Sequence, residues 1–236
     1  MSKLLDSIIK EYPHKIELHC HSSNVSRCSQ ISIPEMISTY KFEKYSGLVI
    51  TNHFYPWQPK TKIGYKKYVD DFIKEYYALA EKGEANGIKV YLGMEIRFEE
   101  NENDYLVYGI DEDFVRNAIS PKMKTLRDFV SSAKNDKNLI LQAHPFRTGM
   151  TLMPSDLLDG IEVYNVHPNH NSRVGFAAKY AEEIGGVCTC GTDFHHTGQG
   201  ALSALLTREL PRDSFDLVNY IKNEPVYKIG SSIITF

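Results

Sequence analysis

Histidine and acidic side chains recur along this chain at the ends of apolar, strand-like segments. The seven residues in such positions are His19, His21, His53, Glu95, His144, Asp193 and His195. Imidazole and carboxylate groups are side chains that commonly bind divalent metal ions in proteins. Their repetition at strand ends predicts that they share one metal site.

Two pairs of these residues carry most of this hypothesis. His19 and His21 lie two positions apart, so their imidazoles project from the same face of an extended strand and can share one ion. Asp193 and His195 repeat this spacing near the other end of the chain. Two such pairs in one sequence indicate a metal site and not a chance arrangement.

The other three candidates carry weaker signals when taken singly. A strand-end histidine such as His53 or His144 is more often a structural residue than a ligand. Glu95 ends an apolar run, where an ionised carboxylate needs a partner that offsets its lost hydration. A metal is the simplest such partner, and an ion pair with Arg97 or another arginine is the alternative. Mixed imidazole and carboxylate ligands suit zinc, manganese or iron better than magnesium or calcium, without choosing among the three.

A shared site requires secondary-structure elements that bring these residues to one place. Besides the runs that end at candidate ligands, β-prone segments predict strands over 104–108, 160–164, 187–192 and 226–229. Apolar residues at helical spacing predict helices over 65–85, 122–134, 171–184 and 214–223, and residues 32–35 resemble a capped helix start. Helices alternate with strands, which favours parallel strands.

The positions of the candidate ligands favour a closed barrel over an open sheet. In an open α/β sheet ligands gather near one switch point, whereas here nearly every strand end carries a candidate. We therefore expect an α/β fold in a single domain over residues 1–236, a TIM-like (β/α) barrel with the metal site at the carboxyl rim of its strands.

Composition and charge restrict the classes of partner. The 236 residues are 42% hydrophobic and 24% charged, which is typical of a globular domain. A formal net charge of -3 gives no broad positive surface for nucleic acid. Without a secretory segment or a run of membrane-spanning length, we expect a cytoplasmic protein with no membrane partner. The four cysteines, Cys20, Cys28, Cys188 and Cys190, are expected to be buried and reduced.

Taken in order, the strand-end motifs resemble those of the PHP (polymerase and histidinol phosphatase) family of metal-dependent phosphoesterases. The matching segments are His19-Cys20-His21, Thr51-Asn52-His53, Gly93-Met94-Glu95, Ala143-His144-Pro145 and Gly191-Thr192-Asp193-Phe194-His195. The resemblance extends from residue 15 to about residue 200. It implies a distorted seven-stranded (β/α) barrel with two or three metal ions at its carboxyl rim.

The resemblance also implies a role for each candidate ligand. One metal would be held by His19, His21, Glu95 and Asp193, a second by His53 and His195, and a third by His144 with Glu95. Family members with three metals carry another histidine or aspartate shortly after the first pair, where this chain has Ser-Arg-Cys at 26–28. No histidine lies between Glu95 and His144 either, so the second and third metal sites could be incomplete, completed by water, or absent.

Such a centre predicts hydrolysis of a small phosphomonoester or a nucleotide, because paired metal ions clamp phosphate and activate water. Asp193 and His195 are the candidate catalytic residues, with His195 or its neighbour His196 as the proton donor. Arg27 and Arg147 follow ligand-bearing strands, and their forked donors suit phosphate oxygens. The substrate itself, the choice of monoester or diester, and the oligomeric state are not encoded in these motifs.

Two alternatives remain open. An amidohydrolase-like barrel also carries a histidine pair on its first strand, although its usual pattern ends in an aspartate without the paired histidine. A non-catalytic module stabilised by metal is the second alternative. Among weaker candidates, we favour a core role for Glu162, while His167 and His170 could cover the substrate or complete a metal site.

Overall fold

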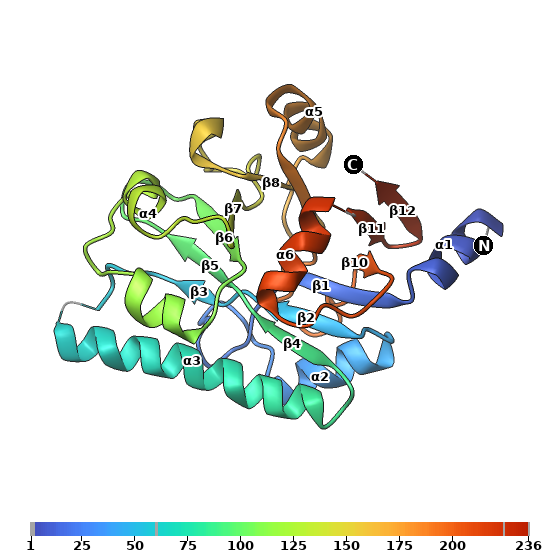
Figure 1. Ribbon diagram of the computed structural model, residues 1–236, viewed down its shortest axis with the longest axis horizontal. Coiled ribbons are helices and arrows are strands. Elements are labelled where there is room, and N and C mark those ends of the chain that lie inside the picture. The colour runs from blue at the N-terminus through green and yellow to red at the C-terminus, as the bar shows by residue number, and fades with distance from the viewer. Residues whose placement is uncertain (1–2, 60, 224, 236) are drawn as a thin grey trace.

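The computed structural model describes residues 3–59, 61–223 and 225–235, in which helices and strands alternate (Figure 1). The helices are α1 (Lys3–Glu11), α2 (Ile33–Phe42), α3 (Lys62–Glu84), α4 (Leu126–Ser132), α5 (Val174–Ile184) and α6 (Ser214–Asn223), with a π-helix η1 (Phe114–Ala118) and a 3-10 helix η2 (Ser155–Leu157). The strands are β1 (His14–Cys20), β2 (Gly47–Ile50), β3 (His53–Phe54), β4 (Lys89–Leu92), β5 (Met94–Arg97), β6 (Asp104–Tyr108), β7 (Leu139–Gln142), β8 (Gly160–Asn165), β9 (Val187–Gly191), β10 (Ser203–Thr207), β11 (Val226–Ile229) and β12 (Ser232–Thr235). The chain therefore has the mixed α/β fold expected from its sequence.

The strands form two six-stranded sheets that are rich in parallel pairs. The first sheet has the order β12-β11-β10-β1-β2-β4, and the second has the order β3-β5-β6-β7-β8-β9. Strands β1, β2 and β4 are parallel, as are β7, β8 and β9, and β3 is parallel to β5. With the exception of β8, these strands hold or directly precede the candidate ligands.

The expectation of parallel strands is wrong for β6 and β11, and the antiparallel strands β10 and β12 were not expected from the sequence. Strand β6 runs antiparallel to both β5 and β7. The physical reason on one side is the length of the connection, because β5 ends at Arg97 and β6 begins at Asp104, whereas a parallel crossover needs a dozen or more residues. Strands β10, β11 and β12 pair antiparallel and extend the first sheet beyond β1.

Backbone hydrogen bonds link the two sheets in two places, beside the end of β2 and beside the end of β1. On one side, Gly93 separates β4 from β5, and its N–H donates to the carbonyl of Ile50 at 3.1 Å. On the other side, the N–H of Asp193 donates to the carbonyl of His19 at 2.9 Å, and the N–H of His21 donates to Phe194 at 3.2 Å. The end of β1 therefore lies directly beside the segment that follows β9.

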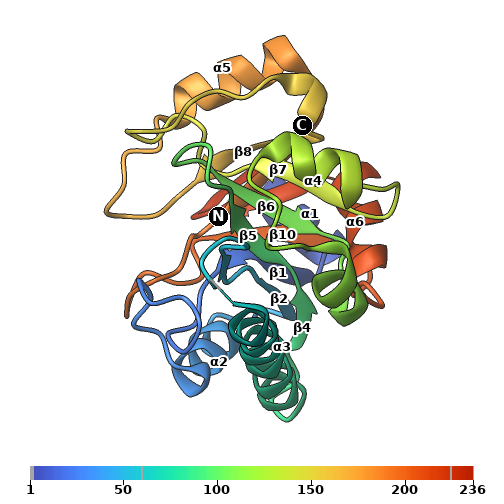
Figure 2. The same cartoon turned by 90° about the vertical axis from the view of Figure 1, so that its left-hand side faces the viewer.

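Apolar side chains cover both faces of the strands. On β6, Leu106 and Tyr108 pack into a cluster with Leu18, whereas Tyr105 and Val107 pack on the other face with Phe129 of α4. Figures 1 and 2 show α3 along one side of the strands and α5 on the opposite side. Strands buried on both faces form a rigid frame, so side chains at their ends are held in fixed positions.

Capping side chains account for the starts of α2 and α4. Ser32 caps α2 by accepting a hydrogen bond from the N–H of Glu35, as the sequence predicts. The helix expected over 122–134 is shorter, because Thr125 and Asp128 form a capping box that starts α4 at Leu126. Within the described ranges, no helix has the length and apolarity needed to cross a membrane.

Gly160 of β8 pairs with Val187 at the start of β9. A substitution at Gly160 tests how closely these two strands pack. A Cβ atom at Gly160 would lie 1.8 Å from the carbonyl oxygen of Val187. We expect Gly160→Ala to reduce the free energy of unfolding by at least about 2 kcal/mol, because overpacking against backbone forces the strands apart. Urea denaturation measures the change.

The matched control is Gly175→Ala in α5, where a Cβ meets no atom within 4 Å. Alanine is the better helix former, so this variant should be neutral or more stable by up to about 1 kcal/mol. Equal stability of the two variants would contradict the close approach of β8 to β9.

Candidate metal centre

The seven candidate ligands lie together at the ends of the strands. His19 belongs to β1 and His21 follows it, His53 begins β3 directly opposite Glu95 of β5, His144 follows β7, and Asp193 and His195 follow β9. Six of them are buried, and the side chain of His53 is only 12% exposed. The structure therefore gathers every residue that the sequence predicted as a ligand, while their binding of metal stays a prediction.

Four of these side chains surround one point. The Nε2 atom of His19 lies 3.4 Å from Oε1 of Glu95 and 3.4 Å from Oδ1 of Asp193. The Nε2 atom of His21 lies 3.4 Å from Oε2 of Glu95 and 3.3 Å from the same Asp193 oxygen. Metal–ligand bonds of about 2.0–2.1 Å in a tetrahedral zinc site place neighbouring ligand atoms about 3.4 Å apart, so these separations fit a metal ion.

Several nitrogen and oxygen atoms of the cluster that could bind a metal are buried without a hydrogen-bond partner. They include Nε2 of His19 and Nε2 of His21, whereas Nδ1 of His53 and Oε2 of Glu95, which also lack an aligned hydrogen bond, lie 2.9 Å apart as an ion pair. Buried polar atoms are almost always paired, so an unpaired group calls for an explanation such as a bound ion. Because the unpaired atoms converge on one another, the donor set fits divalent metal ions.

His53, His195 and His144 extend the cluster on two sides. The ligand atoms of His21, His53 and His195 lie within 4.8 Å of one another. Nδ1 of His195 lies 2.9 Å from the carbonyl oxygen of Asp193, which can only accept, so Nδ1 carries the proton and the neutral ring offers Nε2 as a ligand. Nε2 of His144 lies 3.2 Å from Oε1 of Glu95, which leaves this carboxylate between two groups of imidazoles.

Glu162 orients the cluster and was underestimated from the sequence. It is fully buried, as a core residue would be, but Oε1 lies 2.8 Å from Nδ1 of His19. Its Oε2 accepts from the N–H of His144 and from Nδ2 of Asn165, both at 3.0 Å. A carboxylate on Nδ1 fixes the tautomer that presents the Nε2 lone pair to a metal. An acidic residue inside an apolar strand was the available signal, as it was for Glu95.

Glu17 is a second buried carboxylate that the sequence analysis missed. Its Oε1 accepts from the N–H of His19 at 3.0 Å and from the N–H of Thr192 at 2.9 Å. The Thr192 hydroxyl also donates to it, as does Tyr40 at 3.2 Å. Burial raises the pKa of Glu17 to about 7 despite these donors. Glu17 thus ties the strand of the first histidine pair to the turn that carries Asp193.

Asp104 is a third acidic residue that the sequence analysis did not single out. Its carboxylate comes within 4.8 Å of the ligand atoms of His53 and Glu95. It also receives two hydrogen bonds from Arg97, from Nε at 2.8 Å and from Nη2 at 2.7 Å. This bidentate pair neutralises Asp104, so Arg97 pairs with Asp104 and not, as the sequence alternative had it, with Glu95.

Two candidate ligands have strained backbone conformations. His144 has φ 30° and Asp193 has φ 55°, in the left-handed region that most residues avoid. Such strain costs about 1–3 kcal/mol per residue and clusters at functional sites. The surrounding strands hold both residues in the conformation that turns their side chains toward the cluster.

Charge compensation holds the acidic groups ionised. Burial alone would raise the pKa of Glu95, but His53 and His19 hold it well below its usual value. The pKa of Asp193 is likewise well below its usual value, because His19 and His195 outweigh burial. Conversely, burial opposes the charged form of His195, but its hydrogen bond with Asp193 raises its pKa to about 10. Without metal, protons on His19, His53 and His195, whose pKa values are all raised, balance the carboxylates.

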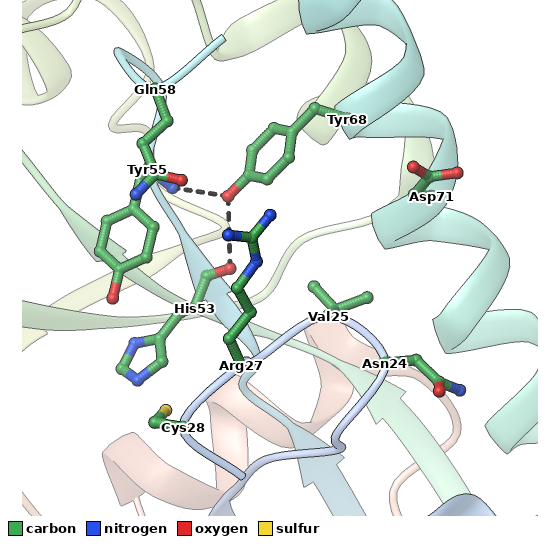
Figure 3. Close-up of a pocket in the computed structure, with 9 residues that line it drawn as sticks. All are labelled: Asn24, Val25, Arg27, Cys28, His53, Tyr55, Gln58, Tyr68 and Asp71. Carbon is green, nitrogen blue, oxygen red and sulfur yellow. Dashed lines mark hydrogen bonds between the residues drawn. The ribbon is translucent and has the colours of Figure 1, made fainter.

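A cavity of about 410 Å³ opens beside His53 (Figure 3). Arg27, Tyr55, Tyr68 and Asp71 contribute to its wall. Figure 3 shows the exposed Arg27 side chain extending across the pocket in the direction of Tyr68. One of the two arginines predicted to bind phosphate therefore lines a cavity next to the candidate metal centre.

The second predicted arginine lies elsewhere. Arg147 is half-buried in the loop after His144 and does not line this cavity. Its charge acts on His167 and His170, which stack with ring centroids 4.0 Å apart. The ring of His167 also lies 5.7 Å from that of His195, so the loop histidines do flank the centre.

The expectation that all four cysteines are buried is wrong for Cys28. Cys20 and Cys190 are buried and Cys188 is half-buried, whereas Cys28 is exposed in the wall of the cavity. The reason is that residues 21–32 form a loop past the end of β1 instead of entering the core. No disulfide joins the four cysteines, which are all free.

The fold and the site define an α/β domain with a candidate metal centre at its strand ends. The PHP domain family matches residues 17–223, so the chain belongs to this family. No curated protein is a significant match to this chain.

Solved structures share the fold at low sequence identity. PsfC from Pseudomonas syringae is 17% identical with a TM-score of 0.60, covering 82% of this chain and 81% of its own. A two-domain protein from Bacteroides vulgatus, described as containing a predicted PHP-like metal-dependent phosphoesterase, is 16% identical with a TM-score of 0.62; the match covers 94% of this chain and 66% of that protein. An amidohydrolase from Chromobacterium violaceum with bound sulfate and no metal is 15% identical with a TM-score of 0.53, covering 78% of this chain and 88% of its own.

The role of Glu162 can be tested by Glu162→Gln, which preserves size but removes the charge beside His19. We expect metal affinity to fall about 10–100-fold, the usual effect of losing an outer-sphere partner. Competition with a chromophoric chelator measures the affinity. Thermal unfolding of the metal-free variant controls for misfolding, and unchanged affinity in a folded variant would refute the orienting role.

The raised pKa of His195 predicts that metal binding releases protons. In the metal-free protein this ring is protonated at neutral pH, so a metal must displace that proton, and affinity should rise with pH up to about 10. Calorimetry in buffers of different ionisation enthalpy measures the released protons, whose number should fall as the pH passes about 10. Binding at neutral pH without proton release would contradict the charge arrangement described above.

Proposed function

We propose that this protein is a metal-dependent phosphoesterase acting on a small phosphomonoester or a nucleotide. The observation that carries the proposal is the convergence of His19, His21, Glu95 and Asp193. The neighbouring ligand candidate His53 lines a cavity together with Arg27. Membership of the PHP domain family supports the same reaction class. A cavity of about 410 Å³ lies within the range of small-molecule sites, and the net charge of -3 gives no reason to expect an extended nucleic-acid surface or a membrane partner.

We also propose that the two sheets form one distorted seven-stranded barrel in a single domain. In this arrangement β4 continues into β5, the strands β5 to β9 follow in order, and β9 returns to β1. The hydrogen bonds of Gly93 on one side and Asp193 on the other support this closure. The antiparallel strand β6 would be its main distortion.

The metal ions of the proposal are two or three divalent ions, with zinc, manganese or iron as candidates. The first would be held by His19, His21, Glu95 and Asp193, the second by His53 and His195, and a third by His144 with Glu95. When bound, such ions activate water near neutral pH and neutralise the charge of a phosphate group. The number of ions depends on whether residues outside the seven complete the second and third sites.

The protein's own groups have distinct parts in the proposed reaction. Arg27 would bind non-bridging phosphate oxygens through its forked donors, and Arg147 would do so from the loop after His144. Asp193 holds His195 through the contacts to Nδ1, at 2.9 Å from its carbonyl and 3.1 Å from its carboxylate. The half-buried His196 lies next to His195 and could give the leaving oxygen its proton.

Assays of hydrolysis and metal binding distinguish two alternative functions from a phosphoesterase. An amidohydrolase activity is favoured only by the fold shared with the Chromobacterium violaceum protein. A non-catalytic role would leave the metal as a stabiliser of the fold. Hydrolysis of amides or lactones would support the first alternative, and metal binding without any hydrolysis would support the second.

The direct test is a panel of phosphoesters offered to metal-free protein reconstituted with zinc, manganese or iron. We expect phosphate release that depends on metal. Asp193→Asn should lower the rate by more than about 100-fold, because a ligand lost from the centre costs at least as much as a lost outer partner. Far-ultraviolet circular dichroism establishes that the variant is folded.

The matched control is Glu183→Gln, an acidic-to-amide change at an exposed position of α5. This variant should hydrolyse phosphoesters at the rate of the unmodified protein. Absence of hydrolysis across the panel with every metal would refute the phosphoesterase proposal. A folded Asp193→Asn variant with full activity would refute the assignment of the centre.

A further inference from the structure

A second cavity, of about 360 Å³, adjoins the cavity that contains Arg27. Tyr55 and Gln58 belong to the walls of both. Tyr55 also contacts the candidate metal centre, because its ring stacks on that of His53 with centroids 5.5 Å apart and an angle of 19° between the planes. Figure 3 shows these two side chains next to one another at the edge of the first cavity. The second cavity therefore lies within reach of a group that extends from a phosphate held beside His53.

The wall of the second cavity contains Trp57, the single tryptophan of the chain. Its side chain is 36% exposed. The ring lies 6.2 Å from that of Tyr55 and is tilted by 56° to it, so the two rings do not cover one another's faces. Tryptophan is the largest apolar side chain and is enriched where proteins bind other molecules. Trp57 thus gives the second cavity a flat apolar surface on which a planar group can stack.

Tyr55 is held in place from the side of the second cavity as well. The guanidinium carbon of Arg97 lies 5.8 Å from the centre of the Tyr55 ring. Arg97 is itself fixed by its two hydrogen bonds to Asp104. A wall that is already rigid loses little conformational freedom when a ligand binds. Tyr55 therefore forms a preorganised boundary between the candidate metal centre and the second cavity.

The charged groups around the second cavity are paired with one another. Besides its bonds to Asp104, Arg97 donates from Nη1 to Glu102 at 2.8 Å. Glu99 pairs with Lys124 at 2.8 Å. Among the residues that line this cavity, Arg97 is the cation, and each of its three nitrogen atoms already contacts a carboxylate. A second phosphate group would therefore meet carboxylates without an unpaired cation, whereas an uncharged group would not be repelled.

We propose that the second cavity binds the leaving group of the substrate, and that this group is an uncharged aromatic ring stacked on Trp57. The substrate would be an aromatic phosphomonoester, with its phosphate beside His53 and Arg27 and its ring beyond Tyr55. A volume of about 360 Å³ is within the range of small-molecule sites. The inference rests on the proposed phosphoesterase function and deepens it by naming the class of leaving group.

The fluorescence of Trp57 tests this binding site without any hydrolysis, because no other tryptophan contributes to the signal. The metal-reconstituted protein is titrated with adenosine and with phenol, which have an aromatic ring but no phosphate. Ribose and cyclohexanol are the matched compounds without an aromatic ring. We expect saturable quenching by an aromatic compound, with a dissociation constant at least about fivefold below that of its matched compound, as stacking on an aromatic side chain provides.

The two aromatic compounds distinguish the sources of the ring. Quenching by adenosine would support a nucleoside as the leaving group, and quenching by phenol alone would support a smaller aryl group. Saturable quenching by neither compound, or equal quenching by the matched compounds, would overturn the proposal.

Substitution of Trp57 provides a second test, which compares adenosine 5'-monophosphate with ribose 5-phosphate and phenyl phosphate with cyclohexyl phosphate. Trp57→Leu should lower kcat/KM for the aromatic ester at least about fivefold more than for its partner. Trp57→Phe keeps an aromatic ring and should restore most of this preference. The matched control is Phe42→Leu, at an 82% exposed aromatic residue of α2 that lines neither cavity. This control should leave the preference unchanged.

The outcomes separate this inference from the proposed function. Equal loss of activity on both members of each pair in Trp57→Leu would give Trp57 a purely structural role and overturn the inference. Metal-dependent hydrolysis without saturable quenching would overturn the inference and leave the phosphoesterase intact. Saturable quenching without hydrolysis of any phosphoester would refute the phosphoesterase and retain only a cavity that binds an aromatic ring.

Discussion

The structure depends on the burial of ionised carboxylates among imidazoles. Glu95 and Asp193 are removed from water, and an isolated buried charge would cost several kcal/mol. The pairing with His19, His53 and His195 offsets that cost and lowers the pKa of both acids. These groups come from segments far apart in the sequence, so the compensation requires the complete arrangement of strands.

Two further buried carboxylates hold the residues of this cluster in place. Glu162 holds His19 and the backbone of His144, and Glu17 holds the backbone of His19 and Thr192. Strands buried on both faces then fix the positions of these outer carboxylates. The left-handed backbone of Asp193 is tolerated because its N–H and its side chain are both engaged.

Much of the candidate site could be predicted because its signal is local. The alternation of His19 and His21 along a strand is a property of extended backbone, and the apolar runs before the ligands identify the strands. The outer carboxylates gave no comparable signal, since Glu17 and Glu162 sit inside apolar runs, and the partners that join them to the far side of the site lie 175 and 143 positions away. Asp104 was missed because its neighbours in space, His53 and Glu95, belong to other strands.

The fold shows the same division between local and distant information. The helix over 214–223 was predicted with its observed boundaries, because spacing of apolar residues decides it. The antiparallel direction of β6 depends on how short its connection to β5 is, which the analysis of strand residues did not weigh. Strands β10 and β12 pair with partners that local pattern does not identify, and they were missed.

The hydrogen bonds from Thr192 to Glu17 have a consequence for the order of folding. They join residues 175 positions apart in the chain. Closing a loop of that length is entropically unfavourable until the intervening strands have paired, so contacts of this kind form late and slow the search for the native state. This link brings the segment of His19 and His21 to the segment of Asp193 and His195. The candidate ligands would therefore come together in one of the last steps of folding.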